Sequence, residues 1–276
     1  MRCPREAIRR RVGRIVEEAT KLGWTGPPFE MHILASLHGF VVRKDESLSS
    51  EQDGCLVPGA RPQILVNPSI SPRRARFTIA HEVVHTLIPD PSASEGHRHW
   101  KYRREAQSPV EQLCQVGAGE LLMPTVYLRR EASGEPVTSD AVMHVHEAFD
   151  VSVEAALRNL VDLSHHGCAM CVLRMMNKPS ELHDGNQVSL PGLDPPVPEK
   201  RLRIVYSWTS RAWDGRYLPS FKSVPEESVA YRASHQTFRS AEEDWTGVGG
   251  LGACMVEVIR QPGDPDGVLC LINDVP

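Results

Sequence analysis

The chain of 276 residues lacks several features that mark whole classes of protein. It contains no run of about 18 apolar residues, so the sequence predicts no membrane-spanning helix. The net charge is only -4, which gives no sign of bulk nucleic-acid binding. The arginine-rich start is interrupted by a glutamate and leads into no apolar stretch. We therefore interpret it as a solvated helix face and not as a secretory signal.

A disulfide framework is also missing. The seven cysteines are an odd number and are spread over the whole chain. They indicate reduced thiols, and we expect a cytoplasmic protein. Cys168 and Cys171 form a lone CxxC pair, with no second pair to complete a structural zinc site. In a strand their side chains would point to opposite faces, so we expect no metal there.

The chain does contain a pattern typical of zinc hydrolases, RFTIAHEVVH at residues 76–85. His81 and His85 stand four residues apart, so on a helix both imidazoles project from one face and can hold one zinc ion. Glu82 lies beside them, where a carboxylate can take a proton from a metal-activated water. The alternative to a metal site is an ordinary helix that carries two surface histidines and a solvated glutamate. The apolar neighbours instead predict a buried helix, in which these polar groups need partners.

A catalytic zinc ion usually keeps three protein ligands and one open position. The candidates for the third ligand are Asp90, His97, His99 and Glu111. The first three lie in a polar stretch that reads as a loop, whereas Glu111 begins an apolar segment with helical spacing at residues 110–123. A carboxylate in the first turn of a helix that packs on the zinc helix can reach the metal. Glu120 is the rival carboxylate, but it lies later in that helix and would face elsewhere.

Residues 90–109 make a long polar loop between the two predicted helices. Long loops inside compact domains are often functional lids, although most of their residues are simply solvated. His97, His99 and Tyr102 are therefore candidates for polarising a substrate carbonyl. If His97, His99 or Asp90 instead closed the fourth zinc position, the metal would be structural.

Together these motifs resemble the ImmA/IrrE family of zinc metallopeptidases. The resemblance rests on RFTIAHEVVH, on EQLC at residues 111–114 and on AGELLMP at residues 118–124, and it covers about residues 10–165. It implies a zincin-like domain in which His81, His85 and Glu111 bind Zn²⁺ and Glu82 is the catalytic acid/base. It also implies a protein substrate, such as a DNA-binding transcriptional repressor that is cleaved under stress.

Two residues depart from the commonest form of the family pattern. Val84 replaces a frequent glycine before the second histidine, and Gly117 stands where an aromatic residue is usual. Neither change removes a ligand. They bear on the packing of the two helices and leave the chemistry intact.

The pattern of the N-terminal part predicts helices at residues 5–22 and 29–37 and short strands at 40–42 and 63–67. We expect residues 63–67 to form a sheet edge that holds an extended substrate by main-chain hydrogen bonds. Residues 139–164 read as two short helices around a turn, and they resemble a helix-turn-helix-like segment of the family. The second helix carries as many acidic side chains as DNA-reading ones, so we favour a packing role.

Residues 176–200 are rich in proline, glycine, asparagine and aspartate and read as a linker or long loop. The sequence predicts strands around this segment, at residues 168–175, 202–208, 253–260 and 267–273. We expect an α+β protein with three parts: a metallopeptidase domain at 1–130, a helical extension at 131–165 and a C-terminal α/β domain at 166–276. In some relatives a GAF-like sensor occupies this last place.

These features predict a cytoplasmic zinc endopeptidase that cleaves a regulatory protein and carries a C-terminal regulatory domain. The alternative is a transcription regulator that uses the zinc fold and the helical pair to bind a partner without hydrolysis. Glu82 favours the enzyme, because a fold used only for binding has no need for a general base. We expect no membrane association and no direct DNA binding.

Overall fold

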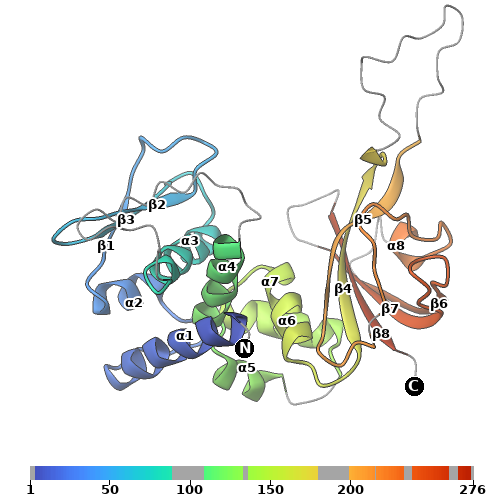
Figure 1. The fold of residues 1–276 in the computed structure, drawn as a ribbon, viewed down its shortest axis with the longest axis horizontal. Coiled ribbons are helices and arrows are strands. Elements are labelled where there is room, and N and C mark those ends of the chain that lie inside the picture. The colour runs from blue at the N-terminus through green and yellow to red at the C-terminus, as the bar shows by residue number, and fades with distance from the viewer. Residues whose placement is uncertain are drawn as a thin grey trace, which may run out of the picture. The chain divides into compact units, whose positions relative to one another are not determined.

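The computed structural model describes residues 4–88, 109–132, 136–179, 199–214, 216–232, 238–260 and 267–274 (Figure 1). By its internal contacts the chain divides into two units of mixed helix and sheet. The first unit is Met1–Glu131 with Val145–Val151, and the second is Ala132–His144 with Ser152–Pro276. The expected three-part division stays a prediction, and the contacts share its helical extension between the two units. Among the described residues, no helix has both the length and the apolar character to cross a membrane.

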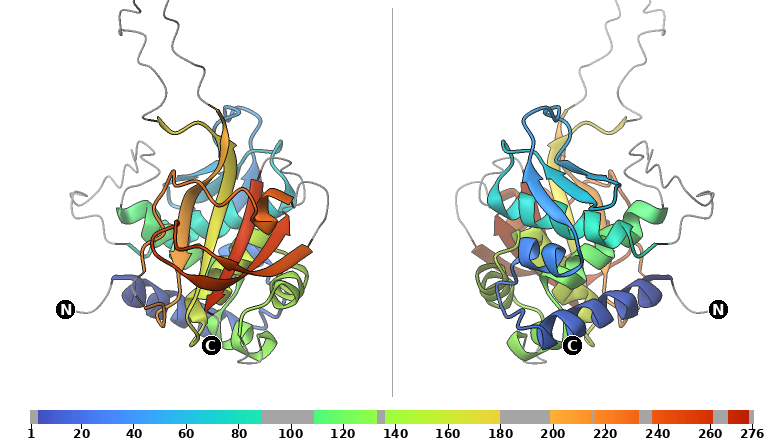
Figure 2. Two further views of the ribbon diagram at one scale, coloured as in Figure 1. Left: turned by 90° about the vertical axis from the view of Figure 1, so that its right-hand side faces the viewer. Right: turned by 90° about the vertical axis from the view of Figure 1, so that its left-hand side faces the viewer.

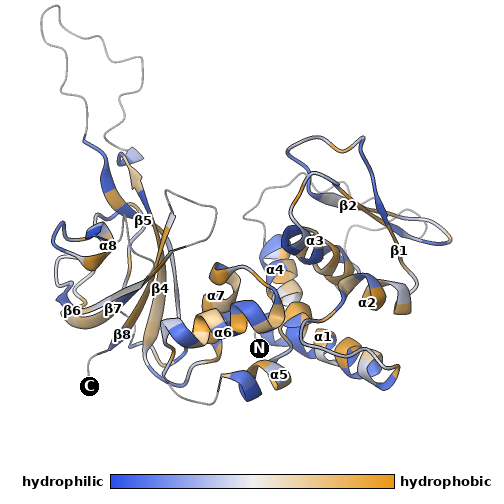
Figure 3. Ribbon diagram, turned by 180° about the vertical axis from the view of Figure 1, so that it is seen from behind, coloured by the Kyte–Doolittle hydropathy of each residue, from blue (hydrophilic) through white to orange (hydrophobic). Residues whose placement is uncertain are grey.

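The first unit begins with α1 (Pro4–Lys21), along which hydrophilic and hydrophobic residues alternate (Figure 3). Its buried residues recur at helical spacing: Ile8, Val12, Ile15, Val16 and Ala19. This stripe packs on α4 (Pro109–Leu122). Two arginines that the sequence placed on a solvated face also make contacts, because Arg9 pairs with Glu120 at 3.8 Å and Arg11 donates to the Leu87 carbonyl.

A three-stranded sheet follows α2 (Met31–Leu37) and consists of β1 (Val41–Lys44), β2 (Gly54–Val57) and β3 (Gln63–Val66). The strand order is β1-β3-β2, with β3 parallel to β1 and antiparallel to β2. The predicted edge at residues 63–67 is therefore wrong. Both other strands pair with β3, which buries Ile64 and Val66, and the edges of this sheet are β1 and β2.

The helix α3 (Pro72–His85) begins directly after this sheet (Figure 2, right). Ser71 caps it by accepting a hydrogen bond from the Arg74 N–H, and Pro72 occupies the first turn. The helix packs on β2, β3 and α4. A Cβ atom at Gly54 would lie 2.6 Å from Thr78 Cγ2, so only glycine lets β2 approach α3 this closely.

Three short helices follow α4: α5 (Thr125–Glu131), α6 (Ser139–Phe149) and α7 (Val153–Leu163). The last two confirm the helical pair expected at residues 139–164. Ser152 caps α7 through the Ala155 N–H at 3.1 Å. In the turn between them Asp150 has φ of 49°, a left-handed conformation that aspartate tolerates better than most residues.

This turn holds the first half of α3. Arg73 Nε donates to Asp150 Oδ1 at 2.6 Å, and Arg76 Nη1 donates to Asp150 Oδ2 at 2.9 Å and to the Phe149 carbonyl at 3.1 Å. Arg76 Nη2 reaches the Phe29 carbonyl at 3.0 Å. The Arg76 side chain is only 12% exposed, so its charge depends on these partners.

Replacing Arg76 with alanine should therefore destabilise the protein by about 1 to 3 kcal/mol, the usual cost of leaving buried hydrogen-bond acceptors such as the Phe29 and Phe149 carbonyls without their donor. The matched control is Arg74→Ala, because Arg74 pairs with Asp53 while its side chain is 55% exposed. Arg74→Ala should lower the free energy of unfolding by at most about 1 kcal/mol. Thermal and denaturant unfolding of both variants measure the difference, and equal losses would contradict the role given to Arg76.

The second unit is built on a five-stranded antiparallel sheet, which faces the viewer in Figure 2 (left). The strand order is β5-β4-β8-β7-β6. The bounds are β4 (Cys168–Met176), β5 (Arg201–Thr209), β6 (Phe238–Asp244), β7 (Ala253–Arg260) and β8 (Gly267–Asp274). Four of these strands confirm the predicted ones. We did not predict β6, because its sequence FRSAEED is largely polar and charged and lacks an apolar alternation.

A large hydrophobic cluster of this unit lies on one face of the sheet. It contains Cys171, Cys254 and Cys270 together with Trp213 and Trp245, and α8 (Val229–Arg232) packs on β6 and β7. The helix α7 packs on β4 and β5. Most of the predicted linker at 176–200 lies outside the described residues.

Candidate metal centre

The helices α3 and α4 lie against each other and bring three of the predicted site residues together. Nε2 of His81 and Nε2 of His85 are 3.0 Å apart. The two oxygens of Glu111 complete the triangle, 3.1 Å from His81 Nε2 and 3.3 Å from His85 Nε2. All three side chains are largely shielded from solvent, with exposed fractions of 15%, 9% and 13%.

These separations suit a tetrahedral zinc ion. Ligand atoms at about 2.0–2.1 Å from zinc lie about 3.3 Å from one another in a tetrahedron. The separations of 3.0, 3.1 and 3.3 Å are close to that value. Two imidazoles and one carboxylate are also a donor set that catalytic zinc sites use. The residues therefore fit the ion that the sequence implies.

The protonation of His85 agrees with this role. Burial and the neighbouring His81 together lower the pKa of His85 to about 4, although the Glu111 carboxylate acts in the opposite direction. At neutral pH the imidazole is uncharged and keeps a nitrogen lone pair. A metal can therefore bind it without first displacing a proton.

Glu82, the predicted general base, follows His81 on α3 and is half-buried. Its charge acts on the same region, because burial first, and then the carboxylates of Glu111 and Glu82, raise the pKa of the Cys114 thiol.

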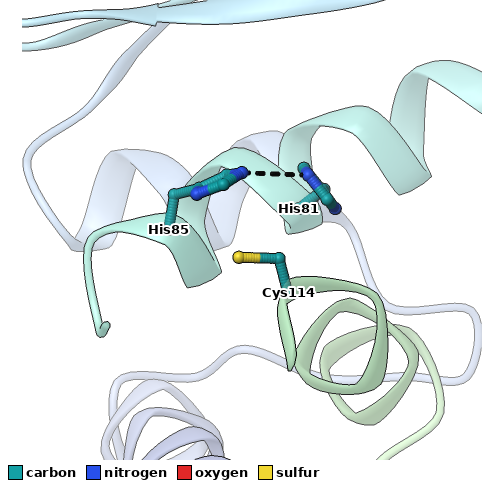
Figure 4. Close-up of side chains that lie close together, drawn as sticks. All are labelled: His81, His85 and Cys114. Carbon is teal, nitrogen blue, oxygen red and sulfur yellow. Dashed lines mark hydrogen bonds between the residues drawn. The ribbon is translucent and has the colours of Figure 1, made fainter. Parts of the chain in front are cut away.

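Cys114 is a fourth donor, and the sequence did not single it out. Figure 4 shows its sulfur on α4 pointing toward the two histidines of α3. One donor atom from each of His81, His85 and Cys114 lies within 4.8 Å of the other two. Cys114 reads as a core residue of an apolar helix, and it is fully buried. The sequence offered one signal for Cys114 as a possible donor. It stands three residues after Glu111, and this spacing puts both side chains on one helix face.

The rival third ligand, Glu120, lies elsewhere. Its carboxylate accepts hydrogen bonds from the Thr125 N–H at 2.8 Å and the Thr125 hydroxyl at 2.7 Å, and it pairs with Arg9. It therefore holds the turn after α4. Asp90, His97, His99 and Tyr102 fall outside the described residues.

The two departures from the family pattern touch each other. A Cβ atom at Gly117 would lie 2.6 Å from Val84 Cγ1 and 3.0 Å from Val84 Cγ2. The larger residue on α3 thus occupies the room that the smaller residue on α4 leaves. This complementary pair sets how closely α3 and α4 approach each other.

Comparison with known proteins agrees with the motifs. Residues 35–161 match the family model of the IrrE N-terminal-like domain of peptidase family M78. Over 114 residues the chain is 34% identical to the radiation response metalloprotease IrrE of Deinococcus deserti, a match that covers 41% of this chain and 40% of that protein. The protein of the same name from Deinococcus radiodurans is 32% identical over 101 residues, which is 36% of this chain and 30% of the relative. The chain thus matches less than half the length of either relative.

A solved structure of a Mycobacterium tuberculosis transcriptional regulator has a similar fold. The TM-score is 0.55 with 13% sequence identity, and the match covers 98% of this chain and 76% of that one. At this identity the likeness concerns the fold alone. The family match includes all of α3 and α4, and with them His81, Glu82, His85 and Glu111. Over residues 35–161 the chain is thus similar to the ImmA/IrrE family, through an IrrE N-terminal-like domain.

Proposed function

We propose that this protein is a zinc-dependent endopeptidase whose first unit is a zincin-like domain. The observation that carries the proposal is the convergence of His81 Nε2, His85 Nε2 and the Glu111 carboxylate within 3.0–3.3 Å, on two packed helices. The domain match to metalloproteases supports the same reading. Comparing hydrolysis by the wild type and Glu82→Gln tests it.

Each residue of the site has a distinct task in this proposal. Zinc, when bound, supplies a Lewis acid that polarises the peptide carbonyl and lowers the pKa of water. His81, His85 and Glu111 hold the ion, and the carboxylate offsets part of its charge. Glu82 accepts a proton from the attacking water and delivers it to the amine that leaves when the peptide bond breaks.

The sheet suggests where a substrate lies. Peptidases of this build bind an extended chain at a sheet edge through main-chain hydrogen bonds. The central position of β3 leaves β1 and β2 as the edges, and β2 is the edge strand that packs on α3. We therefore assign the substrate to β2, at residues 54–57.

For the substrate we propose a regulatory protein such as a DNA-binding repressor. The matched relatives carry a name that links them to a radiation response, which suits a peptidase that switches a regulator. For the second unit we propose a regulatory role as a GAF-like sensor. Its support is the five-stranded sheet with its own hydrophobic cluster.

The second candidate function is a transcription regulator that binds DNA through α6 and α7 without hydrolysis. The protein with the similar fold is a transcriptional regulator, which favours this candidate. The side chains of α7 argue against it, because they are used within the protein. Arg158 lies over the Trp208 ring at 4.1 Å, Asn159 donates to the Ala155 carbonyl at 2.9 Å, and Glu154 accepts from the Tyr206 hydroxyl.

We therefore expect the purified chain to bind duplex DNA weakly and without sequence preference. The net charge of -4 and the engaged side chains of α7 offer little of the basic surface that phosphate binding needs. Titration of labelled DNA at physiological salt measures this, with the gene's own upstream region and a scrambled control. Tight binding to one sequence that is lost in Arg158→Ala would put the regulator first.

A further inference from the structure

The candidate metal centre has one more donor than a catalytic zinc ion needs. We propose that Cys114 is a fourth protein ligand of the zinc ion in the resting protein, so that the site stays closed until the thiolate leaves. This inference rests on the proposed function, because it concerns the same ion. It makes the protein a latent peptidase, in which a substrate carbonyl or a water has to displace a sulfur atom.

The geometry of the two helices carries the inference. Glu111 and Cys114 lie one turn apart on α4. The Glu111 oxygens lie 3.1 and 3.3 Å from the two histidines of α3, and Figure 4 shows the Cys114 sulfur on the same side. The contact between Gly117 and Val84, one turn further along α4, brings the helices close together. As a result, the Cys114 sulfur and a nitrogen of each histidine lie within 4.8 Å of one another. On a tetrahedral zinc ion, sulfur and nitrogen ligands are about 3.6 Å apart, so a small movement of the sulfur brings it into the coordination sphere.

The chemistry of the donors agrees. Thiolate, imidazole and carboxylate are all zinc ligands, and four protein donors make the closed arrangement of structural zinc sites. Without metal, burial first and then the Glu111 and Glu82 carboxylates raise the pKa of the Cys114 thiol, so it holds its proton. A divalent cation reverses this preference. The zinc–sulfur bond forms as the S–H bond breaks, the proton passes to solvent, and no electron is transferred.

Opening such a site means that one ligand leaves and three remain. His81, His85 and Glu111 then form the three-ligand set of a catalytic zinc ion, and Glu82 follows His81 on the same helix. Cys114 thus separates a resting state with four protein ligands from an active state with three.

The test uses cobalt(II) in place of zinc in the full chain, because a cobalt–thiolate bond gives a charge-transfer absorption in the near ultraviolet. The wild type should bind one cobalt ion and show this band. Cys114→Ala should lose the band and bind cobalt at least tenfold more weakly. Cys171→Ala is the matched control, since Cys171 is equally buried but lies in the second unit, and it should keep the band.

The outcomes separate the two proposals. If the wild type binds one cobalt ion without the band, or if Cys114→Ala matches the wild type in spectrum and affinity, Cys114 is not a ligand and the peptidase proposal stands. If the wild type binds no metal, the proposed function fails as well. Should Cys114→Ala fold poorly, the nearly isosteric Cys114→Ser replaces it, and a band that persists in this variant overturns the inference.

Discussion

Replacing Glu82 with glutamine should lower hydrolysis of a protein substrate by roughly 10²–10⁴-fold, the usual contribution of a general acid/base. Glutamine has almost the same shape but cannot accept the proton of the attacking water. The metal and the fold should stay, because the three donor atoms at 3.0–3.3 Å belong to other residues. The measurement is the cleavage rate on one validated substrate, with metal content and the unfolding temperature determined in parallel.

Glu120→Gln is the matched control for this experiment. Glu120 is also a shielded carboxylate on the ligand-bearing helices, but its partners are Arg9 and Thr125. Its replacement should leave cleavage close to that of the wild type. Equal cleavage by the wild type and Glu82→Gln would mean that another residue acts as the base.

The second large effect concerns His85. The variant His85→Ala should lose its zinc on dialysis, since it removes one corner of the donor triangle. Zinc at 100 times its dissociation constant stabilises a protein by about 2.7 kcal/mol, and the variant should lose this metal-dependent gain. Metal analysis and unfolding with and without added zinc measure both losses.

His32→Ala serves as the control for this variant, because His32 is a largely exposed histidine near Glu30. It should keep its zinc. Full zinc retention by both His85→Ala and Glu111→Ala would contradict the assigned ligand set, whatever the activity of the two variants.

The sequence predicted the parts of the site that local spacing determines. Two histidines four residues apart and a carboxylate at the start of the next apolar helix were enough to place His81, His85 and Glu111 together. Cys114 could not be recognised in the same way, because a cysteine in an apolar helical run looks like any core residue. Its proximity to the histidines depends on how the two helices pack, which spacing along one helix does not specify.

The errors in the predicted fold have a related cause. The pattern at residues 63–67 predicts a strand correctly, but strand order depends on pairing between distant segments. The segment FRSAEED of β6 shows the opposite problem, since a charged strand at the end of a sheet needs few apolar residues. Val84 and Gly117 seemed to be two unrelated departures until the structure placed them in contact.

The position of Val145–Val151 has a practical consequence for dissecting this protein. This stretch belongs to the first unit, although the chain on both sides of it belongs to the second. An expression fragment that stops at Glu131 would contain every proposed ligand but would lack Asp150 and the Phe149 carbonyl, and Arg76 would lose those partners. Such a fragment should be poorly soluble and open to proteases. A minimal peptidase fragment therefore has to extend at least to Val151.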